Sequence, residues 1–234
     1  MSGRSKTRLA ELIPEVYRRL YGAYGPQGWW PGDNPFEVIA GAILTQSTAW
    51  TNVEKALAAM RAAGCWSFEA IAALPEPELA AIIRSSGYYN AKARKLRAFA
   101  NHALSRGGID ILFAQQDVTS LRAELLSVHG IGEETADDII VYAAGKPSFV
   151  IDSYTRRIVD RMGLTPAGRN PVYGSYQALF QENLPQDTAL FNEFHALLDH
   201  HAKVSCVKSV PRCTDCCLVD LCPTGSKDTK SKLN

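Results

Sequence analysis

The segment 121–157 constrains the fold more than any other part of the sequence. Its centre is the run His-Gly-Ile-Gly-Glu, residues 129–133, which lies between two stretches whose apolar residues repeat at helical spacing. The first stripe is Leu121, Leu125 and Val128, and the second is Ala136, Ile139, Ile140 and Ala143. Glycines at 130 and 132 permit a sharp backbone turn. The segment therefore predicts a helix-hairpin-helix.

The backbone amides of this turn predict an anion site. The amides of Gly130 and Gly132, with those that open the next helix beside Thr135, can converge on one anion. A DNA phosphate fits that description. His129, in the same turn, is also expected to contact DNA. An ordinary helical hairpin that contains glycine is the alternative. The phasing of both glycines with both apolar stripes favours the phosphate site.

Composition indicates a folded protein and sets limits on its class. The chain has 234 residues, of which 46% are hydrophobic, and it contains no apolar run of the length that a membrane span needs. The N-terminus lacks the apolar core of a signal peptide, so a cytoplasmic, nucleoid-associated location is expected. A net charge of +1 neither supports nor excludes a nucleic-acid partner, because backbone amides can bind phosphate without many basic side chains.

Helical patterns dominate the chain and predict an all-α fold. The helix expected from residue 35 has an explicit start, with Asn34 as N-cap, Pro35 at the first position and Glu37 placed to reach back to the cap. Further helices are expected at about 51–63, 67–74, 76–86, 89–105, 152–162 and 187–204. Three histidines on the last of these, at positions 195, 200 and 201, are expected at the surface or between domains.

Five of the six cysteines lie close together near the C-terminus. Four of them, Cys206, Cys213, Cys216 and Cys222, have the spacing C-x6-C-x2-C-x5-C. Such closely spaced thiolates can bind either a tetrahedral zinc ion or a [4Fe-4S] cluster, and spacing alone leaves both open. Cys217 is expected to point elsewhere.

Together, the hairpin, a downstream aspartate and the cysteine loop resemble the endonuclease III family of helix-hairpin-helix DNA glycosylases. The resemblance runs from about residue 35 to Cys222. It implies a six-helix barrel at 36–146, an iron–sulfur domain made of 1–35 and 147–225, and a [4Fe-4S] cluster on the four cysteines. The polar, lysine-rich tail 226–234 is expected to be disordered.

The resemblance also assigns the catalytic chemistry. Asp152 matches the family's catalytic aspartate, whose carboxylate stabilises positive charge on the sugar as the N-glycosidic bond breaks. A helix N-cap is its alternative role. Bifunctional members carry a lysine in the motif GxGxKTA, which forms a Schiff base. Glu134 stands at that position here and cannot form an imine, so a monofunctional enzyme without lyase activity is expected; otherwise Glu134 is a solvated first-turn acid.

Two further positions match residues that the family inserts into DNA. Gln46 matches the glutamine that fills the gap left by the flipped nucleotide. Tyr88 lies where the family places a wedge residue against the opposing strand, although core packing is the alternative. The expected partner is double-stranded DNA that contains a damaged base, bound by a monomer.

Aromatic residues give the clue to the damaged base. The adenine-mismatch branch has an acidic residue where Gly41 stands here, which disfavours that branch. Trp29, Trp30 and Trp50, with Glu134, resemble the base pocket of the 3-methyladenine branch, because electron-rich rings attract a positively charged alkylated purine. Ordinary core packing of the tryptophans remains open. Lys203 is a further candidate without an assigned role.

Two other functions compete with this interpretation. The same fold would serve a glycosylase for uracil or thymine mismatches, or for oxidised bases, with hydrogen-bonding side chains in the pocket. A non-catalytic protein that recognises DNA structure is the third possibility. The presence of Asp152 argues against the latter.

Overall fold

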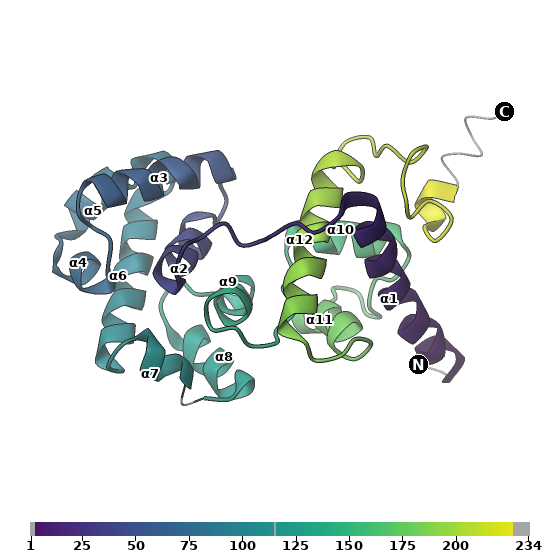
Figure 1. Cartoon of the computed structure of the whole chain (residues 1–234), viewed down its shortest axis with the longest axis horizontal. Coiled ribbons are helices and arrows are strands. Elements are labelled where there is room, and N and C mark those ends of the chain that lie inside the picture. Colours follow the sequence, from purple (N-terminus) through teal and green to yellow (C-terminus); the bar gives the residue numbers. More distant parts are fainter. Residues whose placement is uncertain (1–2, 115, 227–234) are drawn as a thin grey trace. The chain divides into compact units, whose positions relative to one another are not determined.

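The computed structural model of the chain describes residues 3–114 and 116–226, with side chains from residue 8 onward. All the regular structure in these ranges is helical, which confirms the all-α expectation (Figure 1). Two compact units are present. The central unit comprises 30–146, and the terminal unit comprises the described residues up to 29 and from 147. The sequence placed the first boundary six residues later, and the predicted tail 226–234 falls, apart from Ser226, outside the described residues.

The central unit is built on one long helix, α6 (Tyr89–Ser105), which packs against α2 (Pro35–Leu44), α4 (Phe68–Ala73) and α5 (Glu76–Ile82). Its core is fully buried at Ile43, Phe99 and Ile140, among others. The remaining elements are α3 (Trp50–Ala62), the 3-10 turn η1 (Arg84–Ser86), α7 (Ile109–Ala114), α8 (Val118–Ser127), α9 (Glu133–Asp138) and the π-helix η2 (Ile139–Ala143).

The start of α2 shows how local sequence sets these boundaries. Asn34 Oδ1 accepts a hydrogen bond from the Glu37 amide at 3.0 Å, as the sequence predicts. Glu37 reaches back one residue further than expected, because its carboxylate accepts from the Asp33 amide at 3.2 Å. Both contacts satisfy donors at the helix entrance, where intrahelical partners are lacking.

The terminal unit consists of α1 (Gly3–Tyr24), α10 (Ser153–Arg161), α11 (Tyr173–Gln181) and α12 (Thr188–Val204). Helix α12 packs against both α1 and α10. Their shared core includes Phe149, which stacks on Phe180 with ring centroids 4.0 Å apart and meets Phe191 and Phe194 edge-on. No helix in the described ranges is both long and apolar enough to cross a membrane.

Candidate functional site

The hairpin lies in the central unit, where residues 128–132 connect α8 to α9. Gly130 adopts φ +85°, a left-handed conformation that favours glycine. Gly132 is extended, at φ −93° and ψ −178°, so the expectation that the turn requires glycine holds for Gly130 but not for Gly132. Arg122 of α8 donates from Nε to Asp137 Oδ1 of α9 at 3.0 Å. This ion pair, in which Asp137 is fully buried and Arg122 is partly exposed, connects the two helices of the hairpin.

Gln46 is bonded directly to the hairpin. Its Nε2 donates to Thr135 Oγ1 at 2.9 Å and to the Gly130 carbonyl at 3.2 Å. Lys95 Nζ donates to Gln46 Oε1 at 2.5 Å, and the stem of Lys95 covers the turn so closely that a Cβ on Gly130 would lie 2.2 Å from Lys95 Cγ. The structure thus brings Gln46, Thr135 and Gly130 together. Lys95 belongs to the same group, although the sequence did not single it out.

Tyr88 and the two remaining hairpin side chains point outward from the central unit. Tyr88 is 75% exposed and adopts φ +46°, which is unusual for a residue other than glycine. This exposure excludes core packing as its role. His129 is exposed in the turn, and Glu134 is exposed in the first turn of α9, where a negative charge interacts favourably with the helix dipole.

Three aromatic residues of the central unit form a group. Trp30 meets Trp50 edge-on, with ring centroids 5.3 Å apart, and meets Tyr142 at the same centroid distance. The indole also lies against Gly41, where a Cβ would be 3.2 Å from Trp30 Cζ2. Tyr142 was missed from the sequence because it lies on the π-helix η2, a local widening for which helical periodicity gives no signal.

Asp152 lies in the terminal unit at the start of α10. Its side chain accepts a hydrogen bond from the Thr155 amide at 2.7 Å, so it is the N-cap of that helix. The buried His195 of α12 is close enough for the charge of Asp152 to affect it, but desolvation by burial dominates and lowers the pKa of His195. A half-buried carboxylate that is fixed by a backbone donor is well suited to face a developing positive charge.

Trp29 and Lys203 lie together in the same unit. Lys203 Nζ is 5.9 Å from the ring centroids of both Trp29 and Tyr154, and it forms an ion pair with Asp199 at 2.6 Å. Of the three α12 histidines expected at the surface or between domains, His195 and His201 are buried, so a surface location is wrong for these two.

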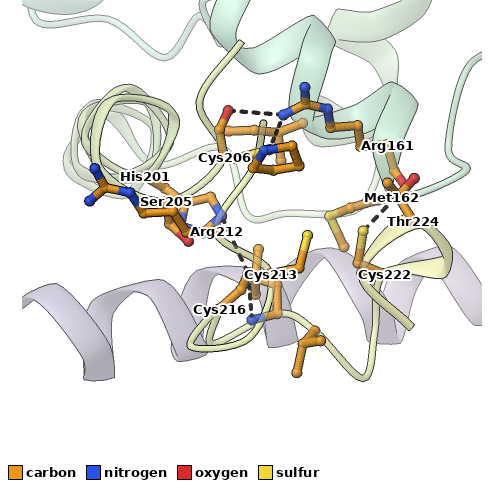
Figure 2. Close-up of a pocket in the computed structure, with 15 residues that line it drawn as sticks. Arg161, Met162, His201, Ser205, Cys206, Arg212, Cys213, Cys216, Cys222 and Thr224 are labelled. Atoms are coloured by element: carbon orange, nitrogen blue, oxygen red, sulfur yellow. Dashed lines mark hydrogen bonds between the residues drawn. The ribbon is translucent and has the colours of Figure 1, made fainter. Parts of the chain in front are cut away.

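Four cysteines of the terminal unit line one cavity (Figure 2). They are the predicted set, Cys206, Cys213, Cys216 and Cys222. Arg161 of α10 donates from Nη1 to Cys206 Sγ at 3.2 Å, and the Leu218 amide donates to Cys216 Sγ at 3.4 Å.

Two further groups adjoin the cysteines. His201 Nε2 lies 3.8 Å from Cys216 Sγ, while its Nδ1 is 2.8 Å from the Tyr24 hydroxyl, and burial lowers the pKa of His201 to about 4. The carbonyl of Cys217 accepts from Arg19 of α1 at 3.4 Å. Burial raises the pKa of the Cys216 thiol, so a cation or a hydrogen-bond donor is needed to hold it as a thiolate.

The donor set of four thiols is chemically suited to metal. Within the described part of the chain, no three His, Cys, Asp or Glu side chains are grouped so as to hold a single metal ion. A zinc ion needs all its ligands at about 2.3 Å from one point. The four thiols line one cavity, and two of their sulfurs accept N–H donors, so they are the residues here that could hold a metal or a cluster through thiolates.

The predicted residues therefore fall into two groups, one in each unit. Trp30, Gln46, Trp50, Tyr88 and the hairpin residues belong to the central unit, while Trp29, Asp152, Lys203 and the four cysteines belong to the terminal unit.

Comparison with known proteins identifies the family. Residues 40–186 match the HhH-GPD superfamily of base excision DNA repair proteins. A protein assigned to the DNA repair glycosylases in Methanocaldococcus jannaschii is 37% identical over 214 residues, which cover 91% of this chain and 96% of that protein. Endonuclease III of Treponema pallidum is 30% identical over 214 residues, 90% of this chain and 94% of that enzyme.

A solved structure adds a match in three dimensions. The H. pylori 3-methyladenine DNA glycosylase, crystallised with 1,N6-ethenoadenine, superposes with a TM-score of 0.71 at 25% identity, over 83% of this chain and 97% of that one. Both the family match and the superposition agree with the helix-hairpin-helix that the sequence predicts at residues 121–157. The chain belongs to the HhH-GPD superfamily and is a DNA glycosylase of base excision repair, which hydrolyses N-glycosidic bonds and binds damaged DNA.

Proposed function

We propose that this glycosylase is monofunctional and removes alkylated purines of the 3-methyladenine and 7-methylguanine type from duplex DNA. The observation that carries the proposal is the aromatic group of Trp30, Trp50 and Tyr142 in the central unit. Alkylation gives these purines a positive charge, and a cation over an aromatic face gains roughly 0.5–2 kcal/mol, depending on desolvation. A neutral parent base gains no such attraction, so the rings discriminate by charge.

Two further facts support this substrate. Position 41 is glycine, where the adenine-mismatch branch has an acidic residue, and the Trp30 indole lies against it, 3.2 Å from where a Cβ would be. The H. pylori protein of similar fold is a 3-methyladenine DNA glycosylase, and it was crystallised with another modified adenine.

In this proposal, Asp152 supplies the negative charge that stabilises the positive charge developing on the sugar. The C1′–N9 bond of the deoxyribonucleotide breaks, the base departs with the bonding electrons, and positive charge develops on the sugar. The Asp152 carboxylate stabilises that charge and orients water, whose oxygen bonds to C1′ and whose proton is released to solvent, which leaves an abasic site. Because the alkylated base already carries positive charge, it departs readily and needs no strong general acid.

The absence of a lysine at position 134 makes the proposed reaction stop at the abasic site. Glu134 stands where bifunctional relatives carry the lysine, and a carboxylate cannot form an imine with the sugar aldehyde. The backbone at Gly130, Gly132 and Thr135, with His129, is proposed to bind phosphate, whereas Gln46 and Tyr88 are proposed to enter the duplex at the flipped nucleotide.

We further propose that Cys206, Cys213, Cys216 and Cys222 hold a [4Fe-4S] cluster. The Arg161 guanidinium on Cys206 and the backbone donor on Cys216 would stabilise two of the thiolates. When bound, the cluster would cross-link the loop that follows α12. About four irons per chain, with broad visible absorption, would support the cluster, whereas one tightly bound zinc ion would contradict it.

A panel of duplexes tests the function. Each duplex carries one 3-methyladenine, 7-methylguanine, uracil, thymine mismatch or oxidised pyrimidine, and products are resolved with and without alkali. Release of methylated purines, with strand breaks only after alkali, is the expected result. Release of only uracil or thymine would show a glycosylase of the mismatch class instead. Strand breaks without alkali would contradict the monofunctional proposal. Binding without any base release would indicate a non-catalytic protein.

A further inference from the structure

Lys92 is a buried lysine in the middle of the central unit. Its side chain is only 1% exposed, although it lies on α6 and carries an ammonium group. Lys92 Nζ donates to the Leu44 carbonyl at 2.8 Å and to the Ser86 carbonyl at 2.5 Å. These acceptors lie more than 40 residues apart in the sequence, so one ammonium group connects two distant segments.

The two carbonyls mark the starts of two loops. Leu44 ends α2 and precedes the Gln46 loop, residues 45–49. Ser86 ends η1 and precedes the Tyr88 loop, residues 87–88. The Leu44 carbonyl belongs to the last turn of α2, which lacks intrahelical donors and carries the negative end of the helix dipole. An ammonium donor is therefore a favourable partner for it.

Both loops contain unusual backbone. Across residues 3–114 and 116–226, the non-glycine residues with positive φ are Ser47, at +56°, and Tyr88, at +46°. A left-handed conformation is costly for residues with a side chain, and it persists only where the surroundings enforce it. Each of these residues follows a carbonyl held by Lys92 within three positions. The amide of Lys92 also donates to the Tyr88 carbonyl, at 3.0 Å.

We infer that Lys92 is a positioning residue that holds the Gln46 loop and the Tyr88 loop in one fixed arrangement, so that both enter damaged DNA together. The inference rests on the proposed function, in which Gln46 fills the gap and Tyr88 wedges the opposing strand. Burial, followed by the charge of Lys95, lowers the pKa of Lys92 to about 8, so the ammonium form still predominates at pH 7. Lys92 touches neither base nor sugar in this role.

A double-mutant cycle tests the inference. The variants Gln46→Ala and Tyr88→Ala, singly and together, are compared for binding to a duplex with an abasic-site analogue opposite 2-aminopurine, whose fluorescence reports the wedge. If the loops act as a unit, the loss in the double variant is smaller than the product of the single losses by about threefold or more. The same cycle in a Lys92→Met background is expected to become multiplicative.

Two controls separate positioning from general stability. Ile71→Ala removes a fully buried side chain of α4, and it is expected to lower stability while keeping the coupling between Gln46 and Tyr88. Should Lys92→Met not fold, hydrogen exchange on the wild-type chain decides: the amides at 45–48 and 86–89 are expected to open together, with one free energy. Separate openings would overturn the inference.

The outcomes also distinguish this inference from the proposed function. Wild-type protein that binds the abasic duplex and changes its fluorescence, but keeps the coupling after Lys92→Met, overturns the role of Lys92 alone. A multiplicative cycle in the wild-type background, where Lys92 is present, also overturns the role of Lys92 alone. No preference for the abasic duplex and no fluorescence change would overturn both.

Discussion

Gly130→Ala is expected to destabilise the central unit, because a methyl group meets two obstacles there. A left-handed φ costs a residue with a Cβ roughly 1–2 kcal/mol, and Gly130 is at +85°. The methyl would also lie 2.2 Å from Lys95 Cγ, which forces that side chain away from Gln46. Losing this half-exposed hydrogen bond adds about 0.5–1.5 kcal/mol, while the reduced entropy of the unfolded chain returns about 0.4–1 kcal/mol. The net loss is roughly 0.5–3 kcal/mol.

Gly132→Ala is the matched control. Its backbone is extended, and a Cβ there meets nothing within 4 Å, so stability is expected to stay unchanged or rise by up to about 1 kcal/mol. Urea unfolding followed by tryptophan fluorescence measures both variants, since Trp30, Trp50 and Trp66 all belong to the central unit. Equal unfolding midpoints for the two alanine variants would refute the assignment of the left-handed turn to Gly130.

The remaining predictions concern the imine, pH and iron. Borohydride is expected to trap no covalent adduct between wild-type protein and reacting DNA, because position 134 holds a glutamate. A trapped adduct would show that an amine elsewhere in the chain attacks the sugar. Because burial lowers the folded pKa of His195 below its ordinary 6.5, the unfolded chain binds more protons below that pH, so stability is expected to fall as pH drops through 6.5. In urea melts between pH 7.5 and 5.5, His195→Asn should flatten part of this slope, and the buried His201 should keep the rest; a slope equal to that of the wild type would contradict the assignment. Cys216→Ser should lose bound iron while Cys217→Ser keeps it, measured as iron per chain, and loss from both variants would refute the distinction.

Local signals predicted much of the fold. The hairpin, the capped start of α2 and the helix at 89–105 could be placed because caps, turns and periodicity depend on neighbouring residues. Helix α11 was missed because its N-cap, Val172, provides no side-chain cap, so no start signal precedes it. Helix α7 was missed because it is short and follows two consecutive glycines.

Features that depend on tertiary packing could not be predicted. Lys92 and Lys95 have the appearance of ordinary polar residues on α6, yet both bind partners brought from more than 45 positions away. Tyr142 joins the aromatic group through a π-helix that the 3.6-residue period does not reveal. The cysteine spacing, by contrast, predicted which four thiols line the cavity, because all four lie in one short segment.

Single-turnover release of 7-methylguanine by Asp152→Asn tests the central claim most directly. Asparagine is as good an N-cap as aspartate, so the variant should keep the hydrogen bond from the Thr155 amide and melt at the wild-type temperature while losing only the charge. If Asp152 stabilises the charge on the sugar, the rate should fall by roughly 100-fold or more at unchanged DNA affinity. Wild-type release by a folded Asp152→Asn protein would show that Asp152 only caps α10.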